Sequence, residues 1–235
     1  GLSDDVNVVN MDPLKCNHCQ HGKRVYSSSM LKMPKSDPGR PSRYHHGNLK
    51  KTIVQTAIQL IEERGEASFT IRELAKSVGV SHAAAYRHFR SKRQLLAQVA
   101  EEGFHGLQAE FDEILRKNEK RSCRARIRGL GNAYVQYALR HPGHFRAMFH
   151  IELQAQGDFP SLKEAGTRAF DSLLNLVAEG IARRELVNRP ARGLATVAWA
   201  AVHGTSLLLL DGQIDSPPEP NDVVKLVMER LDAGL

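Results

Sequence analysis

Apolar residues recur every three or four positions along almost the whole chain after about residue 46, and this spacing constrains the fold more than any other feature. Val54, Ala57 and Ile61 set the pattern, and Gly65 ends the first segment after a charged turn. No alternating strand pattern of useful length appears. The sequence therefore predicts an all-α fold.

Capping residues give the bounds of two short helices. Thr70 and Glu73 form a capping-box pattern, so a helix is predicted from Thr70 to near Gly79. Ser81 is an N-cap residue for a further helix through about Phe89. Two short helices joined by a turn that contains glycine have the dimensions of a helix-turn-helix.

The remaining helices are longer. Ser91 and Gln94 repeat the capping-box pattern and predict a helix that runs to about Lys117. Further helices are predicted at about 122–140, 142–150, 161–184, 190–210 and 221–232.

Charge narrows the class of partner. Lys and Arg outnumber Asp and Glu by 33 to 26, which favours a polyanion such as nucleic acid, although an anionic membrane surface attracts the same charge. Three cysteines make no disulfide framework, and the N-terminal residues carry no apolar secretory segment. We therefore expect a cytoplasmic protein.

The helix after the turn has a surface suited to DNA. Ser81, His82, Ala83, Tyr86 and Arg87 share one side, and the small residues allow the backbone to approach base edges. We expect His82 to read a base edge and Ala83 or Ala84 to touch a thymine methyl group. The candidate DNA-binding residues are Arg43, Thr70, Ser81, His82, Ala83, Ala84, Tyr86, Arg87 and Lys92. The alternative is an ordinary solvated surface.

One longer stretch, "FTIRELAKSVGVSHAAAYRHFRSKRQLL" from Phe69 to Leu96, resembles the N-terminal DNA-binding domain of TetR-type transcriptional regulators. The preceding "GNLKKTIVQTAIQLIEERG" resembles the first helix of that domain. The resemblance implies a three-helix helix-turn-helix domain followed by a C-terminal helical domain that binds a ligand and dimerises. It also implies a ligand-responsive repressor whose dimer binds a pseudo-palindromic double-stranded DNA operator.

Three segments follow from this plan. They are a disordered leader and basic arm at 1–43, a helix-turn-helix DNA-binding domain at 44–95, and an effector-binding and dimerisation domain at 96–235. Because Met33 opens a compact remainder, we expect residues 1–32 to be an expression remnant or an over-long start. The alternative function is an all-helical small-molecule-binding protein or enzyme with an incidental basic N-terminal domain.

Aromatic residues of the second half are candidates for a pocket that holds an unknown small-molecule effector. They are Phe104, Phe111, Tyr134, Tyr137, Phe149, Phe170, Trp199 and His203, and the alternative for each is ordinary core packing. Trp199 and His203 are one helical turn apart and precede Gly204. This resembles the Trp-His-Gly signature of one TetR subgroup, and we expect a structural ring contact between the pair.

Two apolar ridges are candidates for a homodimer interface. Their residues are Leu194, Val197, Ala198, Ala201, Thr205, Leu208, Val224, Val227 and Leu231. The uncharged run 193–210 reaches the lower length limit of a membrane span, but its polar centre favours a helix packed between other helices. We therefore predict no membrane partner.

The sequence motifs do not favour a metal site or a catalytic site. Cys16, Cys19 and His21, with His18 between them, lack a second ligand pair at zinc-finger spacing. We interpret His141, His144 and His150 as helix-start and surface residues. No phosphate-binding loop, nucleophile elbow or paired carboxylate motif appears, so we expect neither cofactor nor enzymatic activity.

Overall fold

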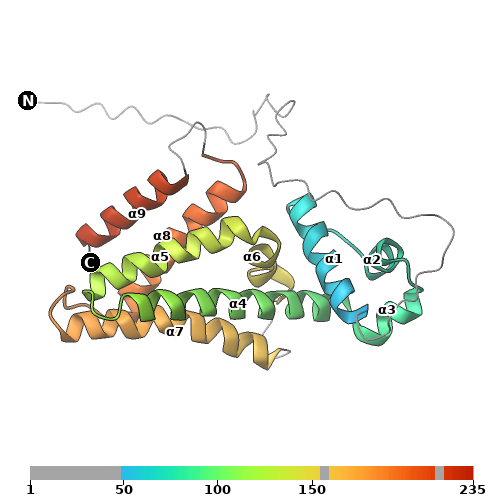
Figure 1. Cartoon of the computed structure of the whole chain (residues 1–235), viewed down its shortest axis with the longest axis horizontal. Helices are drawn as coiled ribbons and strands as arrows, with labels where there is room; N and C mark the ends of the chain where they lie inside the picture. Colours follow the sequence, from blue (N-terminus) through green and yellow to red (C-terminus); the bar gives the residue numbers. More distant parts are fainter. Residues whose placement is uncertain (1–48, 154–158, 215–219, 235) are drawn as a thin grey trace, which may run out of the picture. The chain divides into compact units, whose positions relative to one another are not determined.

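The computed structural model describes residues 49–153, 159–214 and 220–234, and these residues form helices and their connections without any strand. The predicted all-α fold class is confirmed. The helices are α1 (Leu49–Arg64), α2 (Ile71–Val78), α3 (His82–His88), α4 (Lys92–Lys117), α5 (Cys123–Arg140), α6 (Pro142–Met148), the 3₁₀ helix η1 (Ile151–Leu153), α7 (Pro160–Ala182), α8 (Ala191–Leu210) and α9 (Pro220–Gly234), as labelled in Figure 1. Arg43 and the rest of the leader lie outside the described residues.

The caps predicted from the sequence begin and end the short helices. The Thr70 hydroxyl accepts the Glu73 amide at 3.1 Å, and the Glu73 carboxylate accepts the Thr70 amide at 2.8 Å. Gly79 ends α2 at φ +75°, a left-handed conformation that glycine adopts without a steric penalty. Ser81 caps α3 through the Ala84 amide at 3.2 Å.

The cap of α4 differs from the predicted capping box in one of its two hydrogen bonds, the one that the Gln94 side chain accepts. Ser91 accepts the Gln94 amide as expected, at 3.1 Å. The Gln94 side-chain oxygen, however, accepts the amide of Arg90 at 2.8 Å rather than that of Ser91. The glutamine side chain therefore reaches one residue beyond the N-cap and fixes the link between α3 and α4.

The first three helices pack on a shared apolar core. Ile53 and Ile61 of α1, Leu74 of α2 and Phe89 after α3 are fully buried in it. Ala85 is the one residue of α3 buried there, so α3 touches the core along a narrow line. Most of its surface is left for another role.

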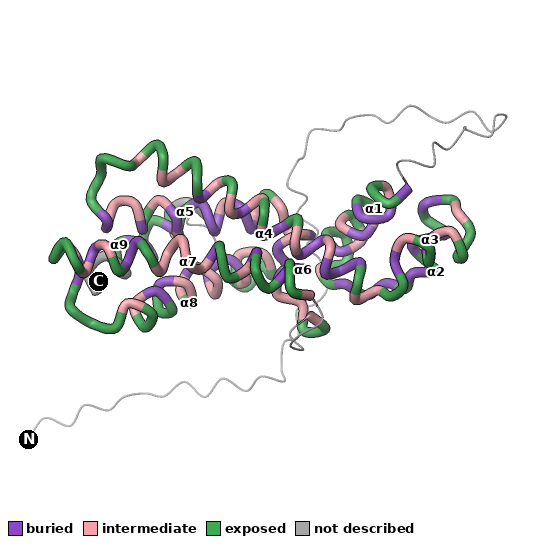
Figure 2. Tube along the Cα trace, turned by 90° about the horizontal axis from the view of Figure 1, so that it is seen from below, coloured by how far each residue is buried: buried purple, intermediate pink, exposed green. Residues whose placement is uncertain are grey.

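Helix α4 continues without interruption through residues 95 and 96, where the two predicted domains meet. It packs against α5, α6 and α7, and α5 in turn packs against α7, α8 and α9 (Figure 1). Buried and exposed residues alternate along these helices in Figure 2, as expected for helices with one face on a common core.

A contact between α1 and α6 joins the first three helices to the rest. A Cβ atom added at Gly143 would lie 2.7 Å from the backbone oxygen of Ile58. The Gly143 amide donates to the Glu62 carboxylate at 3.3 Å. Only glycine allows α6 to approach α1 this closely.

Candidate nucleic-acid interface and effector cavity

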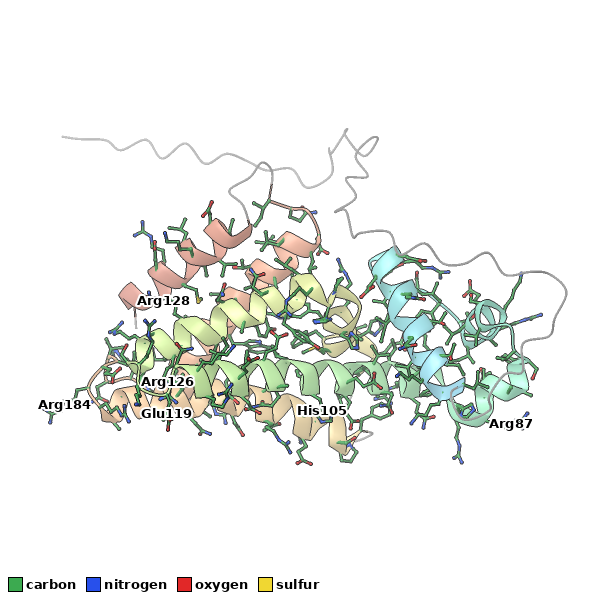
Figure 3. All side chains as sticks on the ribbon, viewed as in Figure 1. Arg87, His105, Glu119, Arg126, Arg128 and Arg184 are labelled. Atoms are coloured by element: carbon green, nitrogen blue, oxygen red, sulfur yellow. The ribbon has the colours of Figure 1, made fainter. Side chains whose placement is uncertain are left out.

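The outer face of α3 carries most of the residues predicted to touch DNA. Ser81, His82, Ala83, Tyr86 and Arg87 are exposed together on this face. In Figure 3 the Arg87 side chain extends outward from α3. This face is the part of the helix that can enter a groove.

His82 and Tyr86 form a pair on that surface. Their ring centroids lie 4.4 Å apart in an edge-on arrangement, which restricts the rotamers of both side chains before any partner is present. Ala84, the other candidate for a thymine contact, is half-buried against the core. Ala83 is the more accessible of the two methyl groups.

The Thr70 hydroxyl, a predicted phosphate ligand, is occupied within the chain. Besides capping Glu73, it lies 3.1 Å from the Glu73 carboxylate and donates its hydrogen there. The hydrogen bonds from Thr70, first that of its backbone amide, lower the pKa of Glu73, so the carboxylate stays ionised as the acceptor. Thr70 contacts a phosphate only by giving up its bond to this acceptor.

Lys92 begins α4 and is also engaged. Its Nζ lies 2.9 Å from Oε1 of Glu152 in η1 and 5.8 Å from the centroid of the Phe69 ring. The next residue, Arg93, donates from Nε to the backbone oxygen of Glu152 at 2.7 Å. The predicted phosphate ligand Lys92 therefore already has a carboxylate partner.

Sequence reasoning missed the Glu152 contact. Glu152 is sixty residues from Lys92 along the chain, and no spacing rule connects them. Its position follows only from α6, which packs on α4 and places η1 beside the start of α4.

A cavity of about 380 Å³ lies within the C-terminal helices. Of the predicted pocket residues, those that line it are Phe104, Phe111, Tyr134, Phe149, Phe170 and Trp199. Tyr137 and His203 do not. Tyr137 packs against His141, with ring centroids 4.7 Å apart, and burial raises its pKa to about 12. His203 lies against the rings of Phe149 and Trp199, outside the lining.

Two residues of the cavity wall, Tyr134 and Trp199, form a hydrogen-bonded trio with His203, which lies outside the lining. Trp199 Nε1 donates to the Tyr134 hydroxyl at 3.3 Å, and that oxygen lies 2.8 Å from Nδ1 of His203. Burial raises the pKa of Tyr134 and lowers that of His203, so both are neutral at pH 7. Since the indole can only donate, the Tyr134 oxygen is its acceptor, and the Tyr134 hydrogen is donated to Nδ1 in the tautomer of His203 that carries its proton on Nε2. The expected Trp199–His203 contact is present, with ring centroids 5.6 Å apart.

Charged residues of the cavity were also missed by sequence reasoning. Arg128 of α5, Asp171 of α7 and Arg192 of α8 belong to its lining. In the sequence these side chains look like the solvated residues of any amphipathic helix. Only the packing of α5, α7 and α8 brings them to one cavity.

Helices α8 and α9 leave an apolar surface uncovered. Val197 and Leu208 of α8 are 59% and 49% exposed, and Leu226 of α9 is 54% exposed. Leu194, Ala201 and Val227 are half-buried, whereas the Leu231 side chain lies outside the described part of α9.

Three predicted interface residues face inward instead. Ala198, Thr205 and Val224 are buried by the chain itself, so packing of α8 and α9 on α5 and α7 accounts for their size and polarity. In this single chain, these three residues therefore do not belong to the exposed surface of α8 and α9. Leu226, which the prediction omitted, belongs to the exposed surface.

The same α8 is, among the helices described, the one long and apolar enough to cross a membrane, and 28% of its apolar window is buried within the chain. The prediction that neighbouring helices would cover it is correct for one side only. The side that carries Val197 and Leu208 stays uncovered.

Within the ranges that the structure covers, no group of three or more His, Cys, Asp or Glu side chains could hold a metal. The rings of His141 and His144 lie 6.1 Å apart. The Cys16, His18, Cys19 and His21 cluster lies outside those ranges.

Two family models match the chain. Residues 53–99 match a model described as bacterial regulatory proteins, tetR family, and residues 127–231 match one described as tetracyclin repressor-like, C-terminal domain. Neither description mentions the Trp-His-Gly subgroup.

Three known proteins are similar to the chain. The nucleoid occlusion factor SlmA of a Marinomonas species is 31% identical over 148 residues, which cover 62% of this chain and 73% of that protein. A Rhodococcus sp. RHA1 structure of unknown function is 33% identical, with a TM-score of 0.70 over 83% of this chain and 99% of its own. The structure of AibR, solved with isovaleryl coenzyme A and operator DNA, is 16% identical, with a TM-score of 0.64 over 79% and 99% of the two chains.

Proposed function

The chain belongs to the TetR family of DNA-binding transcriptional regulators, and we propose that it is a repressor that releases its operator when a small molecule enters the cavity. The observation that carries this proposal is the exposed face of α3, held by caps at Thr70, Gly79 and Ser81. A small-molecule-binding protein without a DNA partner would have no use for this face. The matching family model describes regulatory proteins rather than enzymes, and a cytoplasmic location fits a DNA partner.

The proposed roles of the DNA-binding residues follow from exposure. His82 and Tyr86 read base edges and phosphate, respectively, while Ala83 allows close approach. Arg87 and Lys92 add phosphate contacts, and Arg43 contributes from the arm. The proposed domains are 1–43 for the arm, 44–95 for DNA binding, and 96–235 for the effector and dimerisation.

The test is a mobility-shift titration against DNA upstream of the protein's own gene, at several salt concentrations. A specific complex that competing random DNA does not displace, and that weakens steeply as salt rises, is the expected result. Equal binding to upstream and random DNA would defeat the proposal.

We propose that the exposed surface of α8 and α9 pairs with its copy in a four-helix homodimer interface. Val197, Leu208 and Leu226 would lie in the contact because an uncovered apolar patch on three large side chains is costly in water. Two α3 helices about one DNA turn apart would then match a pseudo-palindromic operator.

Sedimentation of two variants tests the dimer. Val197→Glu places a charge in the proposed contact and should yield monomers. Val187→Glu, at an exposed valine of the α7–α8 link, is the matched control and should leave the dimer intact. A monomeric wild-type protein at micromolar concentration would contradict the interface.

The proposed coupling between cavity and DNA runs through the segment after α6. Phe149 lines the cavity, and three residues later Glu152 holds Lys92 and Arg93 at the start of α4. An effector that displaces Phe149 moves Glu152 and changes what Lys92 offers to a phosphate. Such an effector must bind one arrangement of this segment better than the other.

We also propose membership of the Trp-His-Gly subgroup. The support is that Trp199 and His203 share one hydrogen-bonded trio with Tyr134, and that Gly204 follows on the same helix. Replacing Tyr134 with Phe tests the trio on which this proposal rests: the loss of the shared hydroxyl should alter Trp199 fluorescence and lower stability.

A further inference from the structure

The interior of the cavity offers a ligand mostly apolar contacts. Its wall is dominated by aromatic and aliphatic side chains such as Phe104, Phe111 and Val202. The Tyr134 hydroxyl, a polar group of the wall, is already bonded to Trp199 and His203, and all three are neutral. An ionised group gains nothing in this part of the cavity.

Charge is concentrated elsewhere in the lining. The charged side chains of the lining are those of Arg128, Asp171 and Arg192, and Arg192 is the one that bears on ligand binding. The Arg192 guanidinium lies 5.6 Å from the centroid of the Phe170 ring. The ring centroids of Phe170 and Trp199 are 6.0 Å apart. Ring contact restricts the guanidinium without using its hydrogen-bond donors.

Arg192 forms no ion pair with any carboxylate in the part of the chain that the structure describes. Other arginines of these helices do: Arg126 and Arg183 pair with Glu179, and Arg146 pairs with Asp211. Arg192 is therefore a cation that lines an apolar cavity with its fork of donors available. A carboxylate or phosphate group is the partner that such a fork binds in two-pronged fashion.

We propose that the effector is an amphipathic anion, with an apolar body in the aromatic part of the cavity and a single anionic group on Arg192. This inference rests on the proposed effector role of the cavity and adds the chemical class of the ligand. A ligand of this kind bridges Arg192 of α8 and Phe149, and so reaches the segment that carries Glu152. Neutral apolar molecules of the same size fill the cavity without the ionic contact.

The only tryptophan of the chain, Trp199, lines this cavity and reports its occupancy directly. The experiment titrates the full chain at pH 7.5 with octanoate, 1-octanol and octylamine while Trp199 fluorescence is measured. These probes share one apolar body and differ in charge. The variants are Arg192→Met, which keeps an apolar stem of similar length, and Arg189→Met, at an exposed arginine outside the cavity lining.

The wild-type protein should bind octanoate at least about tenfold more tightly than octanol, as expected for a charged hydrogen-bonded pair. Arg192→Met should reduce that ratio to near one, while Arg189→Met should keep it. Equal affinities, a preference for octylamine, an unchanged ratio in Arg192→Met, or no response to any probe would overturn the inference. A mobility-shift assay with the same preparations distinguishes failure of this inference from failure of the proposed function. DNA binding by the wild-type protein is measured independently of the probe titration.

Discussion

Replacing Glu152 with Gln removes the carboxylate that Lys92 contacts at 2.9 Å while keeping the size of the side chain. The side chains of Lys92 and Glu152 are 27% and 40% exposed, so the pair contributes in the range of partly solvated ion pairs, about 0.5 kcal/mol. DNA phosphates compete with Glu152 for Lys92, and the substitution removes that competition. With two reading heads per dimer the gain counts twice, or about 1 kcal/mol, and operator affinity should rise about fivefold.

The assay is fluorescence anisotropy of a labelled operator duplex with four proteins: wild type, Glu152→Gln, Lys92→Ala and the double variant. The cycle isolates the interaction, because a general gain from one negative charge fewer would persist without Lys92. We expect the fivefold gain to vanish in the Lys92→Ala background. A gain of equal size in both backgrounds, or weaker binding by Glu152→Gln alone, would refute the proposed competition.

Three further predictions concern recognition, packing and pH. His82→Ala should relax base preference at one step of the operator at a cost of about 1 to 3 kcal/mol, measured with single-base operator variants; unchanged preference would mean that another residue reads that base. Gly143→Ala should lower the unfolding free energy by about 1 to 3 kcal/mol, because its Cβ meets the Ile58 backbone oxygen. Gly193→Ala is the control and should not lower it, because the space around Gly193 is open. Equal urea midpoints for the two variants would contradict the α1–α6 contact. Burial lowers the pKa of His144 and His203 from 6.5, so below about pH 6.5 the unfolded state takes up protons that the folded state does not, and stability should fall as pH falls. Urea midpoints at pH 7.5 and 5.5 test this, and His203→Gln should show a smaller fall.

Local signals made the helices predictable. Thr70, Gly79, Ser81 and Ser91 each act on backbone groups within a few residues, so their effect is visible in the sequence and appears at the expected places in the structure. The one deviation, Gln94 reaching Arg90 instead of Ser91, changes no helix bound.

The sites were predictable only where one helix face defines them. The exposed face of α3 follows from the period of a single helix. The cavity charges, by contrast, come from three helices, and Arg192 has no local feature that distinguishes it from Arg189. The same limit applies to α8, since periodicity identified its apolar residues but not which of them α5 and α7 would cover.

The glycine contact between α1 and α6 has a consequence for exchanging parts among relatives. Separate family models match residues 53–99 and residues 127–231, which invites chimeras that join the DNA-binding domain of one regulator to the C-terminal domain of another. In this protein, Ile58 and Glu62 of the DNA-binding domain pack against position 143 of the C-terminal domain, where only glycine fits. Lys92 of the DNA-binding domain also pairs with Glu152 of the C-terminal domain. A graft that carries residues 44–95 alone would keep the DNA-binding surface. It would lose the close α1–α6 contact at Gly143 and the ion pair between Lys92 and Glu152. A working hybrid must therefore at least retain glycine at position 143 and glutamate at position 152.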